Sequence, residues 1–306
     1  PIFIIGLLLL IPSVFGYINT RVNYDVLYYL PDSIETMQGQ DILVDEFGTG
    51  AYSMFICEGM ENKDVAKLKE QIEDVEHVSK VVWYDSFADI SIPMEMLPED
   101  IREAFNADDS TLMFIIFDTT TSADETMDAI ENIRALAGKQ CFLSGMSAIV
   151  TDTKNLAESE VAIYVLIAVV LSCIVLALTM ESYLIPVFFL LSIGMAILYN
   201  MGTNIFMGQI SYITKALSAV LQLGVTMDYS IFLLDAFMNY RKQGMNEEDA
   251  IINAVQEAIN SIFASSLTTV VGFLALVTMK FSIGFDLGLV LAKGIVFSLL
   301  TVVFFM

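Results

Sequence analysis

The sequence predicts an α-helical membrane bundle of six helices joined to an α/β domain outside the cytoplasm. Hydrophobic residues make up 56% of the 306, and the mean hydropathy of +0.67 is too high for a soluble domain. The charge is uneven, because residues 17–160 carry 29 Asp and Glu against 9 Lys and Arg. A membrane bundle with one hydrophilic, acidic block explains both observations. A solvated surface accounts for the acidic charge, so nucleic acid is not an expected partner.

Six apolar segments form the expected bundle, and the complete ones are long enough to span about 30 Å of hydrocarbon. We interpret the first, 1–17, as a membrane helix lacking its start, because the chain begins with Pro1 and ends in an apolar run. A signal peptide with a small-residue cleavage site at Ser13–Gly16 is the alternative. The rest form a five-helix domain over 161–306, with helices at 162–180, 183–201, 216–238, 258–279 and 285–306.

Basic residues set the expected orientation of these helices. Arg241 and Lys242 close the fourth helix and begin a short polar loop, 239–257. The positive-inside rule places this loop in the cytoplasm. Counting back along the helices makes domain 18–160 extracytoplasmic, in a multi-pass protein of the cell membrane.

The hydrophilic domain alternates strand and helix patterns. Apolar and aromatic runs predict strands at 51–57, 78–84, 111–117 and 140–144. Helices are expected over 62–75 and 122–137, with Asn62 and Ser122 as N-caps. The order β-α-β-β-α-β is that of the split ferredoxin-like unit, here with an insertion at 85–110. Helical periodicity puts the following side chains on the faces that should pack against the sheet: Val65, Leu68, Ile72, Met127, Ile130, Ile133 and Leu136.

Two cysteines test this strand order. Cys57 ends the first strand and Cys141 begins the fourth, and these strands are antiparallel neighbours in a ferredoxin-like sheet. The two residues should therefore be close in space. A disulfide can persist outside the cytoplasm, and two buried thiols are the simpler alternative.

Asp228 is the most informative residue of the chain. It lies near the middle of the fourth helix, 216–238, where a carboxylate costs about 3 kcal/mol on insertion scales. Such residues usually face a bundle interior or a water-filled path and handle protons, although a hydrogen-bonded structural Asp is the alternative. Tyr229 adds a hydroxyl, and Gly224 leaves space for a close helix or water on the same face. Asp235, seven residues on, is either a proton access point or a solvated helix end.

Two further sets of polar residues extend this candidate site. Lys293 stands in the sixth helix about 12 Å from its outer end, which is long for snorkelling. We therefore expect Lys293 to be a counter-ion of Asp228. The fifth helix has a hydroxyl-rich face, used either for interhelical hydrogen bonds or in a proton wire, made by Ser265, Ser266, Thr268 and Thr269.

The sequence gives no reason to expect an enzyme or a cofactor. The single histidine, His77, and three scattered cysteines make no metal-binding set. A Gly-rich phosphate loop with its Lys, which would bind ATP, does not occur in the sequence. Energy for any transport would have to come from an ion gradient.

The order of elements and several motifs resemble the half-repeat of the RND superfamily of exporters, and more narrowly its MMPL branch. Gly224–Leu233 resembles the Gly-x-x-x-Asp-Tyr signature of that branch's fourth helix, and Ser265–Phe273 is similar to its fifth. Leu30–Asp32 and Asp45–Gly48 resemble the start of its external lobe. The resemblance implies proton-driven export of hydrophobic or lipid-like molecules.

One departure from the family pattern leaves alternatives open. A complete member has two such repeats, twelve helices in all, with a second Asp-Tyr helix facing the first. This chain has one repeat, so we expect a fragment of a longer protein, or else two copies that pair. The SecD/SecF protein-export pair and sterol-sensing domains share the same six-helix half. A protein-export accessory and a regulatory module without transport are therefore the rival functions.

Overall fold

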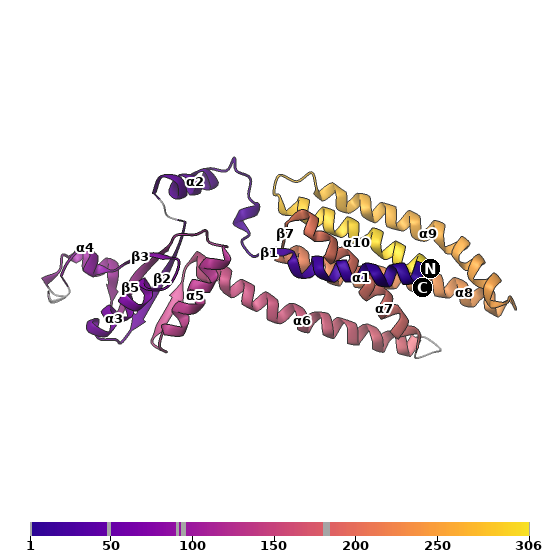
Figure 1. Ribbon diagram of the computed structural model, residues 1–306, viewed down its shortest axis with the longest axis horizontal. Coiled ribbons are helices and arrows are strands. Elements are labelled where there is room, and N and C mark those ends of the chain that lie inside the picture. Colours follow the sequence, from indigo (N-terminus) through magenta and orange to yellow (C-terminus); the bar gives the residue numbers. More distant parts are fainter. Residues whose placement is uncertain (1, 48–49, 90–91, 93–95, 180–183, 306) are drawn as a thin grey trace. The chain divides into compact units, whose positions relative to one another are not determined.

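The computed structural model describes residues 2–47, 50–89, 92, 96–179 and 184–305. It divides into two compact units (Figure 1). The bundle unit comprises Pro1–Pro31 and Ala157–Met306, and the lobe comprises Asp32–Leu156. Four predicted helix ends, Pro1, Met180, Tyr183 and Met306, lie outside the described residues.

Five helices are long and apolar enough to cross a membrane. They are α6 (Met146–Thr179), α7 (Ile185–Gly202), α8 (Tyr212–Lys242), α9 (Glu247–Leu276) and α10 (Ile283–Phe305). The first predicted span is a shorter apolar helix, α1 (Ile2–Asn19). The protein is therefore mostly helical, with at least five candidate spans among the described residues.

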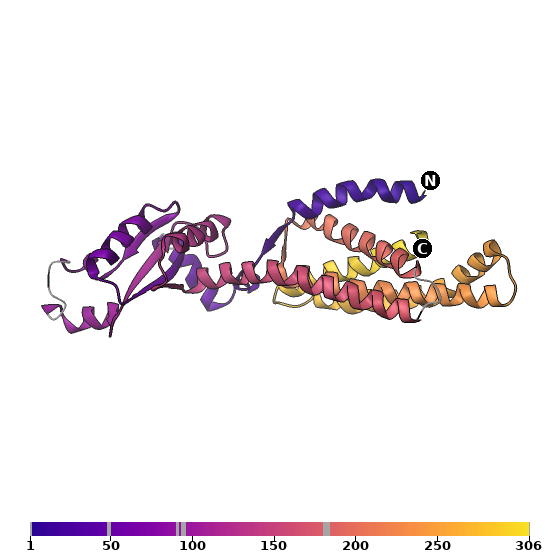
Figure 2. The ribbon, with the colours of Figure 1, turned by 90° about the horizontal axis from the view of Figure 1, so that it is seen from below.

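Helix α10 is the centre of the bundle unit, because it packs against α7, α8 and α9. Small residues permit this close packing: a Cβ on Gly288 would lie 2.6 Å from the carbonyl oxygen of Phe273 in α9. Helix α1 lies along α7 (Figure 2), where the glycines Gly16 and Gly202 leave no room for a side chain between the two backbones.

Two predicted boundaries are wrong. The loop expected at 239–257 is mostly helical, because α8 continues to Lys242 and α9 already begins at Glu247. The charged residues that suggested a loop instead form helix ends, and the Asn246 side chain caps α9 by accepting the backbone N–H of Asp249 at 2.7 Å. Helix α6 begins at Met146, well before the predicted start at 162.

The lobe contains a β-sheet and several helices. Its strands β2 (Ala51–Glu58), β3 (Val78–Val82), β5 (Ser110–Phe117) and β6 (Cys141–Ser144) are ordered β3-β5-β2-β6, with every neighbouring pair antiparallel. A short strand, β4 (Asn106–Ala107), also pairs with β5. Four helices belong to the lobe: α2 (Glu35–Phe47), α3 (Asn62–Glu73), α4 (Glu99–Phe105) and α5 (Asp124–Leu136).

One hydrophobic core joins α3 and α5 to the sheet. Five helix side chains that were predicted to be buried belong to this core: Val65, Leu68, Ile72, Ile130 and Ile133. Met127 is also buried, but Leu136 is 42% exposed because it lies at the end of α5. The predicted caps are wrong by one residue each, since the N-cap positions are Glu61 and Ala123.

The predicted proximity of Cys57 and Cys141 is confirmed. They are directly paired residues of β2 and β6, with 3.6 Å between their Sγ atoms, and both are free thiols. Burial, and then the neighbouring Cys141, raises the pKa of the Cys57 thiol to about 12. The Cys57 thiol is therefore protonated and unreactive at neutral pH.

The lobe core gives a direct test of the helix phase. Ile133→Ala should lower the free energy of unfolding of the lobe by about 2–5 kcal/mol, because Ile133 is fully buried. Leu136→Ala, one turn along the same helix, should cost less than about 1 kcal/mol. The single tryptophan, Trp83, is fully buried in this core, so its fluorescence during denaturant unfolding measures both variants. Equal losses for the two variants would contradict the assigned packing.

Candidate functional site

Asp228 occupies the middle of α8. The 31 residues of this helix span about 46 Å, and the Ser211 side chain caps its start by accepting the backbone N–H of Ile213 at 3.1 Å. Asp228 is exposed within this chain, as is Gly224 one turn earlier. A Cβ on Gly224 would meet no described atom within 4 Å. This face of α8 is therefore uncovered, and the close neighbour expected at Gly224 does not come from the described part of the chain.

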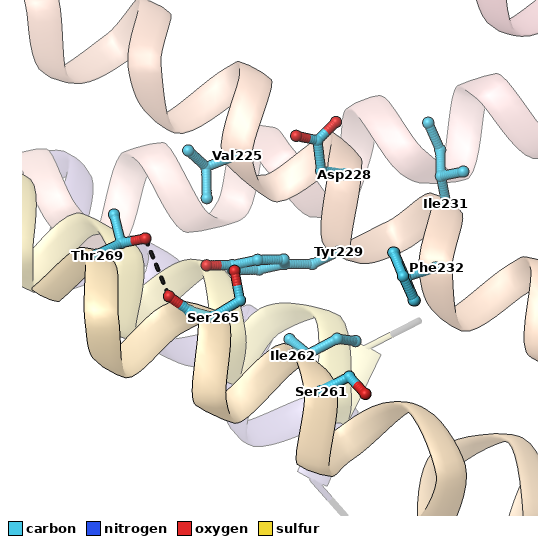
Figure 3. A pocket seen from close by; sticks show the side chains of 9 residues that line it. All are labelled: Val225, Asp228, Tyr229, Ile231, Phe232, Ser261, Ile262, Ser265 and Thr269. Carbon is cyan, nitrogen blue, oxygen red and sulfur yellow. Dashed lines mark hydrogen bonds between the residues drawn. The ribbon is translucent and has the colours of Figure 1, made fainter.

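Asp228 and Tyr229 border a pocket of about 570 Å³ between α8 and α9. Tyr229 extends across this space with its hydroxyl toward Ser265 and Thr269, while the Asp228 carboxylate lies on the other side of its ring (Figure 3). The Tyr229 hydroxyl is buried and has no hydrogen-bond partner among the described residues. The pocket thus combines a carboxylate with an unsatisfied phenol. The other lining residues are Val225, Ile231, Phe232, Ser261 and Ile262.

The hydroxyls of α9 bond mainly to their own helix. Thr268 and Thr269 both donate to the carbonyl of Ser265, at 2.8 and 3.0 Å, and buried Ser266 donates to the carbonyl of Ile262 at 2.7 Å. Ser265 and Thr269 nevertheless line the pocket. Such back-bonding leaves each hydroxyl oxygen able to accept one more hydrogen bond.

The structure directs Lys293 away from Asp228. Its Nζ donates to the Oδ1 of buried Asn204 at 2.5 Å, and the charge of Asp286 acts on it. No hydrogen bond or ion pair joins Lys293 to Asp228 within the described ranges, so the predicted pairing is wrong here. Lys293 was matched to Asp228 because of its charge and membrane depth, but the helical phase of α10 turns it toward Asn204, in the 3-10 helix Thr203–Met207 that follows α7. Asp235 is exposed, in the half of α8 that leads to Lys242.

A buried polar stripe runs along α8 and was not predicted from the sequence. Every fourth residue of the helix is polar and buried: Thr214, Ser218, Gln222, Thr226 and Ser230. This i, i+4 repetition was visible in the sequence as one continuous helix face. It was overlooked because none of these side chains is charged.

The stripe bonds to α7 and α10. Gln222 accepts from the Nδ2 of Asn200 at 3.0 Å and donates to the carbonyl of Gly294 at 3.1 Å. The Oγ1 of Thr226 lies 2.6 Å from the Oγ of Ser298. Asp286, which was also missed, accepts from Thr214 at the outermost position of the stripe. The three helices are therefore joined by a polar layer that excludes lipid.

Comparison with known proteins places the chain among named relatives. It is 26% identical over 341 residues to a membrane protein of Methanocaldococcus jannaschii, covering 98% of this chain and 88% of that protein. It is 28% identical over 198 residues to the transport protein MmpL12 of Mycobacterium tuberculosis, covering 61% of this chain and 17% of that protein. Membrane protein YdfJ of Bacillus subtilis matches at 24% identity over 201 residues, covering 63% of this chain and 27% of YdfJ.

The chain therefore spans most of one relative and about a quarter or less of the two others. The model of the MMPL family matches residues 59–306, which begin directly after β2 and include every later element of the structure. This match covers Asp228, Tyr229 and the whole buried stripe of α8. Its extent, together with the five helices that are able to cross a bilayer, establishes that this multi-pass membrane protein belongs to the MMPL family.

Proposed function

We propose that the chain is one half of a proton-driven exporter of hydrophobic or lipid-like molecules. Family membership and the similarity to a named transport protein support a membrane transporter of the RND/MMPL type. The single observation that carries the proton-driven step is the position of Asp228. Its carboxylate lies at mid-helix and borders the pocket that also contains the unpartnered hydroxyl of Tyr229, with the hydroxyl-bearing face of α9 on one side.

A proton relay is the chemistry that this arrangement supports best. Asp228 takes up the proton, and the Tyr229 hydroxyl is free to donate to the charged carboxylate or to a group on a partner. Ser265 and Thr269 supply further acceptors in the same pocket. Lys293 takes part in the proposed relay through its contact with Asn204, just after α7. Asp235 marks the access route from the other end of α8.

The uncovered face of α8 supports a second six-helix unit as partner. Gly224, Asp228 and Asp235 are all exposed there, and charged groups facing lipid are costly. The unit is either a second repeat of a longer chain or a second copy of this one. The relative from M. jannaschii favours a second copy, because this chain covers 88% of it and leaves too little sequence for another such repeat.

A second pocket supports an amphipathic cargo. It has a volume of about 380 Å³ and is formed by α1, α6, α7, α8 and the segment after α1. One end is polar and aromatic: the Tyr24 hydroxyl donates to Glu158 at 3.1 Å, the Tyr24 ring stacks on Tyr212, and Lys215 lies over Tyr17. The other end is apolar, with Val161, Ala162, Val165, Ile197, Leu198 and Ala219. A lipid headgroup and its acyl chain match these two ends.

The proposal also fixes sidedness and architecture. With Arg241 and Lys242 in the cytoplasm, the lobe is extracytoplasmic and α1 serves as the sixth membrane helix. The element order and the strand order β3-β5-β2-β6 support a ferredoxin-like lobe of the porter type. In this orientation the headgroup end of the second pocket would face the outside.

Replacement of Asp228 tests the function. Asp228→Asn keeps the shape of the side chain and removes its titration, so proton-coupled transport should fall by on the order of 100-fold, as for loss of a proton-transferring group. The measurement is dissipation of an imposed pH gradient, followed with a trapped pH-sensitive dye in proteoliposomes of the full chain. Asp128→Asn, an exposed lobe residue, is the matched control.

Retention of full proton flux by Asp228→Asn would reject the relay. It would favour a regulatory module of the sterol-sensing type, in which the carboxylate is dispensable. Dependence of the flux on an added unfolded polypeptide, rather than on lipid, would favour the SecD/SecF-like alternative.

The second pocket makes a separate prediction about cargo. Tyr212→Ala should weaken binding of a fluorescently labelled phosphatidylethanolamine about five-fold, since a stacked aromatic pair contributes about 1 kcal/mol. Tyr164→Ala is the control, because Tyr164 is 59% exposed on α6. The measurement is equilibrium binding to the purified protein. Equal affinities for the two variants would remove this pocket from the cargo route.

A further inference from the structure

Asp286 is the most deeply buried carboxylate of the bundle unit. It lies in the first turn of α10, and the residue is only 5% exposed. Its Oδ2 accepts the backbone N–H of Ser211 at 2.6 Å and the hydroxyl of Thr214 at 2.9 Å. These contacts tie α10 to the start of α8. Its Oδ1 is buried and has no hydrogen-bond partner among the described residues.

Tyr29 presents a second buried polar group within electrostatic reach of this carboxylate. The residue is 5% exposed, and its hydroxyl likewise lacks a partner within the described residues. Burial, and then the charge of Asp286, raises the pKa of Tyr29, whereas the Ser211 side chain lowers it. Its carbonyl oxygen accepts from both the N–H and the hydroxyl of Ser282, at 3.0 and 2.9 Å, so Tyr29 is fixed to the start of α10.

Lys293 is the charged group that acts on Asp286 from the same helix. It lies seven residues further along α10, about 10 Å away at 1.5 Å per residue, and therefore on the same face. Asn204 holds its Nζ, as described above, and the charges of Lys293 and Asp286 act on each other. The described titratable groups that act on Asp286 are thus Tyr29 and Lys293.

A purely structural role does not account for this arrangement. A carboxylate that only anchored two helices would have both oxygens satisfied, since a buried polar atom without a partner costs about 1–3 kcal/mol. Here one oxygen is saturated and the other has no partner, and the charge of Asp286 reaches the Tyr29 hydroxyl, which also lacks a partner among the described residues. The two groups are complementary, because a phenol can both donate and accept.

We propose that Asp286 is a proton-binding site separate from Asp228, with the proton on Oδ1 and Tyr29 as its hydrogen-bond partner. In the charged form the Tyr29 hydroxyl donates to Oδ1, and Lys293 compensates the charge. On protonation a hydronium ion gives its proton to Oδ1 and is left as water, so one O–H bond breaks and one forms. The new Oδ1–H then donates to the Tyr29 oxygen, in place of the hydrogen bond that the Tyr29 hydroxyl donated before.

The site lies where proton binding can affect two elements of the structure. Tyr29 lies three residues before Asp32, where the lobe begins in the sequence, and Ser211 is the N-cap of α8. Protonation of Asp286 therefore changes hydrogen bonding at both the exit to the lobe and the start of the helix that carries Asp228. Its use in transport rests on the proposed function, but the protonation itself does not.

Infrared difference spectroscopy of the purified full chain tests the site. Lowering the pH should produce a carboxylic acid C=O band that shifts in D2O, and Asp286→Asn should remove it. Asp128→Asn should leave that band unchanged. Tyr29→Phe should keep the band but move it to higher wavenumber, because the acid loses its hydrogen-bond acceptor. Tyr28→Phe is the matched control, since Tyr28 is 56% exposed.

Two outcomes would overturn the proposal. The first is an Asp286→Asn protein with the same acid band as the wild type. The second is a Tyr29→Phe spectrum identical to that of Tyr28→Phe. If Asp286→Asn does not fold, this second comparison by itself decides the proposal. The measurement uses neither cargo nor gradient, so the Asp286 band persists in Asp228→Asn even if the transport proposal fails. Conversely, if Asp228→Asn loses proton flux but no Asp286 band is found, the transport proposal stands and the Asp286 site fails.

Discussion

The polar stripe of α8 is the constraint on which the bundle depends. Inside a bilayer its side chains have no water to bond with, so other helices must satisfy them. Gln222 does this in both directions, toward Asn200 on α7 and the backbone of α10. Gly294 makes the contact possible, because a Cβ there would lie 2.7 Å from the Nδ2 of Asn200. These bonds have direction, and they fix the rotation of α8 in a way that apolar packing alone would not.

Once this rotation is fixed, the exposure of Asp228 follows. Thr226 belongs to the buried stripe, and Asp228 lies two residues further, about 200° around the helix. The same hydrogen bonds that bury one face therefore present the carboxylate on the opposite one. Tyr229 lies between the two faces, which explains why its ring is buried while its hydroxyl reaches the pocket shared with α9.

Much of the lobe was predictable, whereas the contacts of the bundle were not. Ile130 and Ile133 could be assigned because periodicity alone places them on one helix face. Cys57 and Cys141 could be paired because strand order follows from element order. Asp286 was not predicted because its partner, Ser211, is 75 residues away in the sequence. In addition, a single acid at the start of an apolar segment is easily taken for a solvated helix end. Charge and depth were insufficient to place Lys293, because helical phase decided its contact with Asn204.

Asp228 and Asp286 have α8 in common. Asp286 bonds to the start of this helix, and Asp228 lies on its middle, so a change at either site acts on one continuous element. The hydroxyl of Thr226 already contacts both Ser298 and the carbonyl of Gln222, which leaves little freedom for a proton wire along the stripe. A shift or rotation of α8 is therefore the simpler means of coupling. Such coupling requires two arrangements of the helix, with different bonds at Asp286 in each.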